Sequence, residues 1–210
     1  NEQTRRGFLA QSAKLVAAAG LVSGAGCSEL GMSGPERGPV MKVVAGAKPR
    51  KLGANDKIRF GIIGAGNRCN YVMKQLFAMD RNISIKAVAE PVQSNVDRAL
   101  KDIKEALNEK PDIYMGQDDY KTKLLARDDI DAILTATPCC MHAEIFLACF
   151  AAGKHVYGEK PAAITINEAD AMVEAQKRNP DLICQVGFQR RGTTLYAVGV
   201  QKIREGMIGK

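Results

Sequence analysis

Histidine and aromatic residues are scarce in this 210-residue sequence. It contains two histidines and no tryptophan, and aromatic residues make up 5% of it. The six cysteines show no zinc-ligand spacing and fall in segments typical of an α/β domain, so the sequence predicts neither a metal site nor a disulfide framework. It also lacks a basic helix with interleaved aromatics, which argues against a nucleic-acid partner.

The net charge of +7 lies mainly in the first 57 residues. They hold 9 Lys and Arg against 4 Asp and Glu, whereas the remaining residues hold 21 against 19. Because the rest of the chain is nearly balanced, the excess charge does not indicate a nucleic-acid-binding face. The hydrophobic content of 46% and the charged content of 25% are typical of a soluble globular domain.

Residues 1–27 resemble a twin-arginine (Tat) export signal. Arg5 and Arg6 precede an apolar pair, and an Ala- and Gly-rich run follows from Leu15 to Gly26. That run has no polar face, and it is too short and too rich in glycine to span a membrane. The resemblance implies that the Tat export machinery carries the folded protein to the periplasm. Cys27 resembles a lipoprotein site that would anchor the protein by a lipid, and cleavage near the same point without lipid is the alternative.

Residues 28–57 are rich in Gly, Pro and basic residues and show no lasting period. They predict a linker that is disordered or lies along the surface. The sequence starts at Asn1 without an initiator methionine and stops just after a helical pattern closed by Gly206, so we expect a fragment of a longer protein.

A strand, a glycine turn and a helix start follow. The apolar run 58–63 breaks at Gly64 and Gly66, and a helical pattern begins after them. In dinucleotide-binding folds such a turn lets the backbone approach a pyrophosphate at the helix N-terminus. The third position of the fingerprint holds Cys69, which is small enough for close helix–strand packing. The cofactor contacts predicted at this turn are Gly64, Ala65, Gly66, Asn67 and Arg68, with a mere surface position as the alternative for the arginine.

A second strand-like run, 83–90, ends in Glu90. It lies about 20–30 residues after the glycines, where dinucleotide folds place the carboxylate that binds the adenosine ribose hydroxyls. A carboxylate there repels the 2′-phosphate of NADP, so the sequence predicts NAD as the cofactor, with NADP as the alternative.

Strands and helices alternate through the rest of the sequence. The predicted fold class is therefore α/β, a Rossmann-type doubly wound parallel sheet, with the start of a truncated second α+β domain. A capping box at Ser94 and Asp97 is predicted to open one helix, and Asn167 to cap a later one. The further predicted elements are helices at 96–107, 120–126, 143–152, from 167 and at 196–205, and strands at 113–115, 132–136, 155–157 and 183–188.

Several polar residues follow the fourth and fifth predicted strands. Thr137, Pro138 and His142 come after one, and Glu159 and Lys160 after the other. Because the carboxyl ends of parallel strands meet at one edge of the sheet, we expect these residues to join the glycine turn at one rim, where ligands bind.

At this point the sequence resembles the glucose–fructose oxidoreductase/inositol dehydrogenase (Gfo/Idh/MocA) family. The shared motifs are GAGNR at the glycine turn, TPxxxH after the fourth strand, AGKHVYGEKP at the fifth and VGFQRR at 186–191. The resemblance runs from about residue 58 to residue 210, and its GEKP element is the most specific. It implies a two-domain NAD(P)-dependent oxidoreductase that acts on a sugar or polyol. The implied domains are a dinucleotide-binding domain at 58–188 and the start of a substrate domain at 189–210. The rest of that substrate domain is expected to provide a possible contact between subunits of a homo-oligomer.

The resemblance also implies roles for single residues. The family's lysine reaches the substrate hydroxyl near the nicotinamide, so Lys160 is the expected acid–base group while hydride passes between substrate and cofactor. His142 is a catalytic or cofactor-facing candidate through the TPxxxH match, and a polar end group of its helix is the alternative. His155, inside the fifth strand, is expected to be structural.

Two other interpretations stay open. NAD-dependent glycosidases of family 109 share this architecture and leader, and the stretch 113–133 is similar to theirs, although they usually depart from the EKP that this sequence keeps. A non-catalytic nucleotide-binding module is the other, because the substrate domain, with the Asp and His that the family places there, is absent. The fragment alone is expected to bind dinucleotide and to turn over nothing.

Overall fold

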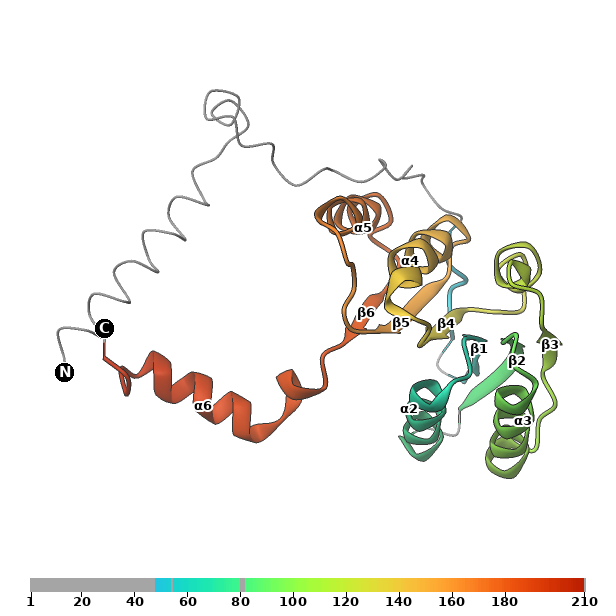
Figure 1. The fold of residues 1–210 in the computed structure, drawn as a ribbon, viewed down its shortest axis with the longest axis horizontal. Coiled ribbons are helices and arrows are strands. Elements are labelled where there is room, and N and C mark those ends of the chain that lie inside the picture. Colours follow the sequence, from blue (N-terminus) through green and yellow to red (C-terminus); the bar gives the residue numbers. More distant parts are fainter. Residues whose placement is uncertain (1–47, 54, 80–81, 210) are drawn as a thin grey trace, which may run out of the picture. The chain divides into compact units, whose positions relative to one another are not determined.

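The computed structural model describes residues 48–53, 55–79 and 82–209 (Figure 1). The predicted export signal, with Cys27, and most of the predicted linker lie outside these residues. No helix in the described ranges is long and apolar enough to cross a membrane.

Six parallel strands form one sheet in the order β3-β2-β1-β4-β5-β6. The chain starts in the middle at β1, builds outward through β2 and β3, and then returns to β4 on the other side of β1. This reversal is the switch point of a doubly wound sheet, so the Rossmann-type prediction is confirmed. The strands are β1 Ile58–Ile63, β2 Ile83–Ala89, β3 Asp112–Tyr114, β4 Ala132–Thr135, β5 His155–Glu159 and β6 Cys184–Gly187.

Helices cover both faces of the sheet, with α2 and α3 on one face and α4 and α5 on the other (Figure 1). The helices are α2 Asn67–Met79, α3 Gln93–Leu107, α4 His142–Ala151, α5 Ile166–Arg178 and α6 Thr194–Arg204. Three short turns complete the described chain: the π-helix η1 Tyr120–Leu124 and the 3₁₀ helices η2 Cys139–Met141 and η3 Gln189–Gly192.

Each face of the sheet has its own large apolar core. Because side chains alternate along a strand, Ile62 of β1 belongs to the core under α2 and α3, and its neighbour Ile63 to the core under α4. Cys69 packs into the first of these cores with no exposed surface, and burial raises the pKa of its thiol to about 12. Its predicted role in close helix–strand packing is therefore confirmed. Met79, the last residue of the same helix, is 84% exposed.

The predicted capping box at Ser94 and Asp97 is wrong. Helix α3 begins at Gln93 with Val92 as its N-cap, and no side chain caps it. Instead, a residue that precedes the helix holds its start. Glu90 accepts hydrogen bonds from the backbone N–H of Val92 and from the side chain of Asn95.

A capping box is present in α5, two residues before the predicted cap at Asn167. Thr165 accepts a hydrogen bond from the backbone N–H of Glu168, whose carboxylate accepts one from the backbone N–H of Thr165. This reciprocal pair satisfies two backbone donors that the helix start would otherwise leave free.

The described end of the predicted linker is held on the domain by an ion cluster. Asp131, just before β4, is buried and accepts hydrogen bonds from the side chain of Arg50 and from both the backbone N–H and the side chain of Arg59, at 2.7–3.1 Å. Of the two alternatives for the linker, residues 48–53 and 55–57 thus lie along the surface. Burial alone would raise the pKa of Asp131, but the hydrogen bonds from Arg59 and Arg50 hold it well below its ordinary value.

We expect Asp131→Asn to lower the free energy of unfolding by about 2 kcal/mol at neutral pH, because two arginines lose the carboxylate they share. The pKa is depressed in the folded state, so this stability is fully present above the unfolded-state pKa of about 4 and is lost as the pH falls through the lower folded-state value. Urea unfolding at pH 7 and pH 3 measures it. The difference in the free energy of unfolding between wild type and variant should be smaller at pH 3 than at pH 7. An equal difference at both pH values would contradict the assignment.

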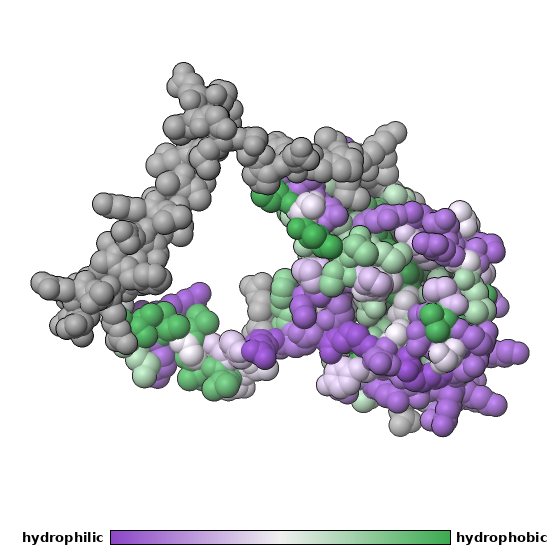
Figure 2. Space-filling model, in the orientation of Figure 1, coloured by the Kyte–Doolittle hydropathy of each residue, from purple (hydrophilic) through white to green (hydrophobic). Residues whose placement is uncertain are grey.

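The last helix contributes nothing to either core. None of the residues of α6 is buried, and Figure 2 shows a mostly hydrophobic colour over this helix. Its exposed apolar residues are Leu195, Tyr196, Val198, Val200 and Ile203.

Candidate active site

The glycine turn between β1 and α2 has the backbone that its sequence predicts. Gly64 has φ +78, and a Cβ at this position would lie 2.7 Å from Cγ2 of Thr137, so only glycine fits. A Cβ at Gly66 would meet nothing within 4 Å. The space over Gly66 is therefore open, and the start of α2 faces it with the backbone N–H groups of its first turn.

Glu90 lies at the carboxyl end of β2 beside this turn and is only 5% exposed. Its Oε2 accepts a hydrogen bond of 2.7 Å from the backbone N–H of Ala65, and its Oε1 accepts one of 3.0 Å from that of Val92. These bonds fix the carboxylate between the glycine turn and the start of α3.

Arg98 of α3 reaches the same place, which sequence reasoning missed. Its guanidinium donates to Oδ1 of Asn67 and to Oδ1 of Asn95, each at 2.7 Å, and to the carbonyl oxygen of Ala65 at 3.3 Å. The side chain of the predicted cofactor contact Asn67 is thus held by Arg98. Arg98 is half-buried, and a helical pattern does not distinguish such an arginine from its polar neighbours, so no sequence signal pointed to it.

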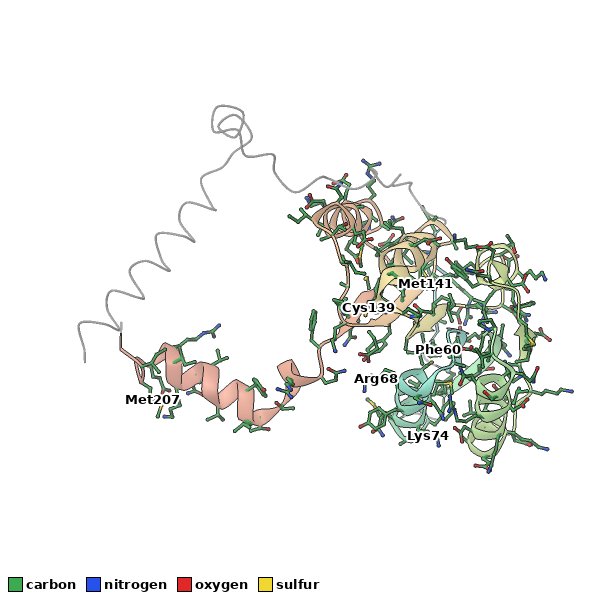
Figure 3. The ribbon with its side chains drawn as sticks, viewed as in Figure 1. Phe60, Arg68, Lys74, Cys139, Met141 and Met207 are labelled. Atoms are coloured by element: carbon green, nitrogen blue, oxygen red, sulfur yellow. The ribbon has the colours of Figure 1, made fainter. Side chains whose placement is uncertain are left out.

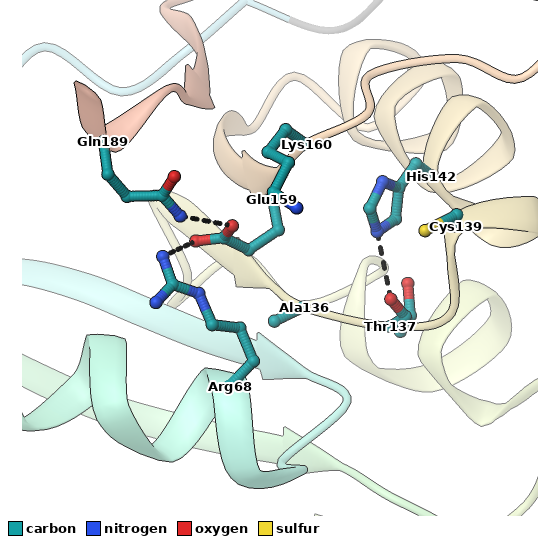
Figure 4. Close-up of a pocket in the computed structure, with 8 residues that line it drawn as sticks. All are labelled: Arg68, Ala136, Thr137, Cys139, His142, Glu159, Lys160 and Gln189. Atoms are coloured by element: carbon teal, nitrogen blue, oxygen red, sulfur yellow. Dashed lines mark hydrogen bonds and ion pairs between the residues drawn. The ribbon is translucent and has the colours of Figure 1, made fainter. Parts of the chain in front are cut away.

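A pocket of about 310 Å³ opens beside the turn, between the ends of β4 and β5 and the start of α2 (Figure 4). Its lining residues are Arg68, Ala136, Thr137, Cys139, His142, Glu159, Lys160 and Gln189. Five of these were predicted from the sequence as site residues. Pro138, predicted with them, stands as the N-cap of η2 beside the pocket.

Glu159 is the buried acid of this pocket, with its side chain 7% exposed. Its Oε1 accepts a hydrogen bond of 2.7 Å from Arg68, and its Oε2 accepts one of 3.1 Å from the amide of Gln189 (Figure 4). Arg68 lies at the start of α2 (Figure 3) and reaches Glu159 of β5 in the close-up of Figure 4. Its hydrogen bond with this carboxylate raises its pKa. The ion-pair partner of Arg68 is therefore Glu159.

Lys160 follows Glu159 directly and is exposed to the pocket. Its ammonium group forms no hydrogen bond or ion pair with the described part of the chain, although a buried carboxylate belongs to the preceding residue. A flexible amine at the rim that has no partner within the domain is available to a ligand.

His142, at the start of α4, is 1% exposed and lies across the pocket from Glu159. Its Nδ1 lies 2.6 Å from the carbonyl oxygen of Pro161, and its Nε2 lies 3.0 Å from that of Thr137. The ring therefore links the loop after β4 to the turn after β5, and neither ring nitrogen is open to a substrate. The expected structural role of His155 fits its contact, because its Nδ1 accepts the backbone N–H of Ile183 at 3.0 Å.

The rim fits a dinucleotide. The space over Gly66 is free, Glu90 is fixed at the carboxyl end of β2 beside the glycine turn, and Oγ1 of Thr137 is buried without a partner in the described residues. An orphaned hydroxyl and a free helix start are polar groups that a bound ligand satisfies.

A comparison with protein families agrees with this geometry. The family model described as "Oxidoreductase family, NAD-binding Rossmann fold" matches residues 58–188. The chain belongs to the Gfo/Idh/MocA family. Residues 58–188 are therefore an NAD-binding Rossmann domain of that oxidoreductase family.

Named relatives of the Gfo/Idh/MocA domain include glycosyl hydrolases and an inositol dehydrogenase. The chain is 30% identical over 158 residues to a glycosyl hydrolase family 109 protein of Shewanella baltica (strain OS195), which covers 74% of this chain and 33% of that protein. An α-N-acetylgalactosaminidase of Shewanella oneidensis is 30% identical over 156 residues, or 73% and 33% of the two chains. A solved scyllo-inositol dehydrogenase from Lactobacillus casei, with bound NAD(H) and scyllo-inositol, matches with a TM-score of 0.60 and 26% identity over 74% of this chain and 43% of that one. The chain spans about a third of the length of these curated relatives.

Proposed function

We propose that the complete protein is an NAD-dependent oxidoreductase that moves hydride between the cofactor and a hydroxyl-bearing carbon of a sugar or polyol. The observation that carries the proposal is Lys160, a lysine without a partner in the described domain, which lines the pocket next to the dinucleotide rim. The scyllo-inositol dehydrogenase with the same fold acts on a polyol, which supports this substrate class.

In this proposal one set of residues binds the cofactor and another transfers a proton. Gly64, Gly66 and Glu90 hold the dinucleotide along the rim, and Thr137 offers its hydroxyl from the pocket wall. When bound, NAD supplies the hydride acceptor. Lys160 takes the proton of the substrate hydroxyl through its Nζ as the carbonyl forms and returns it in the reverse direction. His142 acts as a positioning residue, because its ring links the two loops that flank the lysine.

A second candidate is an NAD-dependent glycosidase on the same fold. The relatives named glycosyl hydrolase family 109 protein and α-N-acetylgalactosaminidase favour it. In that case oxidation of the sugar is transient, and the proton transfer proposed for Lys160 prepares cleavage of a glycosidic bond.

The two candidates differ in whether reduced cofactor accumulates. The complete protein is supplied with NAD and, in separate samples, with scyllo-inositol, myo-inositol, glucose and p-nitrophenyl α-N-acetylgalactosaminide. A dehydrogenase produces NADH in proportion to oxidised substrate. A glycosidase releases p-nitrophenol with no net NADH. Tight NAD binding with neither product across this panel and a wider set of sugars would support the nucleotide-binding module instead.

We expect NAD to bind more tightly than NADP, by about 10-fold or more, because the fixed carboxylate of Glu90 repels a 2′-phosphate. Titrations of the purified chain with NADH and NADPH, followed by cofactor fluorescence, measure both affinities. Glu90→Gln should shrink the difference, since it removes the charge and keeps the size. Tighter binding of NADPH to the wild-type chain would refute the expectation.

We also propose that residues 1–27 direct export through the Tat machinery, which accepts folded proteins and so permits the cofactor to bind before transport. Replacement of Arg5 and Arg6 by lysines should retain the complete protein in the cytoplasm. An unchanged periplasmic yield would contradict the proposal. The mass of the mature N-terminus distinguishes a lipid on Cys27 from cleavage without lipid.

A further inference from the structure

One ion pair joins the first turn of α2 to the strand that carries the proposed acid–base group. Arg68 is the second residue of α2, next to the glycine turn, and its Nη2 lies 2.7 Å from Oε1 of Glu159, the last residue of β5. Gln189 of η3 completes the arrangement from the other side at 3.1 Å. Three segments that are far apart in the sequence therefore meet at one carboxylate (Figure 4).

The carboxylate of Glu159 needs a positive partner. Its side chain is 7% exposed, and a buried charge without a counter-charge is costly. Within the described residues Arg68 is its ion-pair partner, whereas Gln189 is a neutral donor. The next cation along the chain is Lys160, which is adjacent in the sequence and unpaired.

Packing keeps Glu159 in the direction of Arg68. A Cβ on Gly187 of the neighbouring strand β6 would lie 3.0 Å from Oε1 of Glu159 and 2.6 Å from the hydroxyl of Tyr157, so the backbone of β6 closes one side. The guanidinium of Arg68 also lies 5.4 Å from the ring centre of Tyr71 on its own helix. An arginine placed in this way presents a planar group of N–H donors to the carboxylate.

We propose that Arg68 is a positioning residue that occupies the carboxylate of Glu159 and thereby leaves the amine of Lys160 free for the substrate. The inference rests on the proposed role of Lys160 and adds to it a reason why this lysine stays unpaired. Without Arg68 the buried carboxylate recruits the adjacent ammonium, because an ion pair at short range favours the charged form of both groups. The amine is then held at the wall of the pocket and is less available as a base.

The test measures the reactivity of the Lys160 amine and needs no substrate. The complete protein is treated with a limiting amount of acetic anhydride, which attacks neutral amines, and acetylation at Lys160 is quantified by peptide mass spectrometry. The exposed Lys177 on α5 is the internal reference in the same sample. The variants are Arg68→Met, Glu159→Gln and the double substitution, each checked for a cooperative thermal transition.

We expect Arg68→Met to slow acetylation of Lys160 by about 3–10-fold relative to Lys177, as a newly formed ion pair would. Glu159→Gln alone should leave the rate at the wild-type value, and the double variant should restore it, because the carboxylate is gone in both. Since Arg68→Met leaves a buried charge and can fail to fold, Arg68→Gln is the second variant, which keeps a hydrogen-bond donor and is expected to slow Lys160 in the same way.

An unchanged rate in the folded Arg68 variants, or a slow rate that the double variant does not restore, would overturn the proposal. A protein that shows this pattern but turns over neither polyols nor glycosides would keep the positioning role of Arg68 and disprove the proposed function. The two failures are therefore distinguishable.

Discussion

Replacement of Lys160 by alanine is expected to lower kcat of the complete protein by about 10²–10⁴-fold, the usual contribution of a positioned acid–base group. The effect follows from the place of this lysine, which lines the pocket beside the cofactor rim and has no partner within the described domain. The affinity for NAD should remain nearly unchanged, because the residues that fix the dinucleotide turn are Gly64, Gly66 and Glu90. Steady-state kinetics with whichever substrate of the proposed panel is turned over, together with NADH titration, measure both quantities.

Lys177→Ala is the matched control, because Lys177 is exposed in the last turn of α5, away from the pocket. It should leave kcat and NAD affinity at the wild-type values. A Lys160→Ala enzyme with full kcat would show that another group accepts the proton. A parallel loss of NAD affinity would assign the lysine to cofactor binding instead.

Gly66→Val is expected to weaken dinucleotide binding by about 10²–10³-fold without lowering the thermal stability of the apo domain. A Cβ at Gly66 meets no atom of the protein within 4 Å, so a side chain can start at this position without a clash at its first atom. It projects into the open space at the start of α2, which a pyrophosphate must approach closely. NADH titration and thermal unfolding of the 210-residue chain measure affinity and stability.

Substitutions at two other glycines serve as controls for Gly66→Val. Gly199→Ala in α6 also adds a Cβ that meets nothing, and it should leave NADH affinity unchanged. Gly64→Ala should lower both affinity and stability, because Gly64 has a positive φ and its Cβ would strike Thr137. Wild-type affinity in the Gly66→Val domain would show that the dinucleotide does not lie over this turn.

The order of strands and helices could be predicted because each carries a strong local signal. The run 58–63 is apolar and ends at two glycines, and the second strand ends in Glu90, which the structure places against the backbone of Ala65. The carboxyl ends of parallel strands share one edge by geometry, so five of the eight pocket residues could be placed together before any contact was known, and Ala136, Cys139 and Gln189 were missed. The boundaries that failed, at Ser94 and Asn167, depend on which of several polar side chains reaches a free backbone N–H.

The partners inside the site could not be predicted. The pairing of Arg68 with Glu159 joins residues 91 positions apart, and that of Arg98 with Asn67 joins residues 31 apart. Such contacts depend on side-chain direction in the folded state, which no periodicity in the sequence reports. The same holds for His142, where the motif marked the residue but not the two carbonyl oxygens that its ring contacts.

The Arg50–Asp131 contact determines where a fusion partner or a solid support would join this domain. Asp131 precedes β4, so it lies at the amino ends of the strands, while the dinucleotide rim lies at their carboxyl ends. Whatever is fused upstream of residue 48 joins the domain at the edge opposite the pocket. A fluorescent protein, an affinity tag or a solid support placed there leaves the cofactor rim facing outward, which suits this domain to immobilised nucleotide sensing.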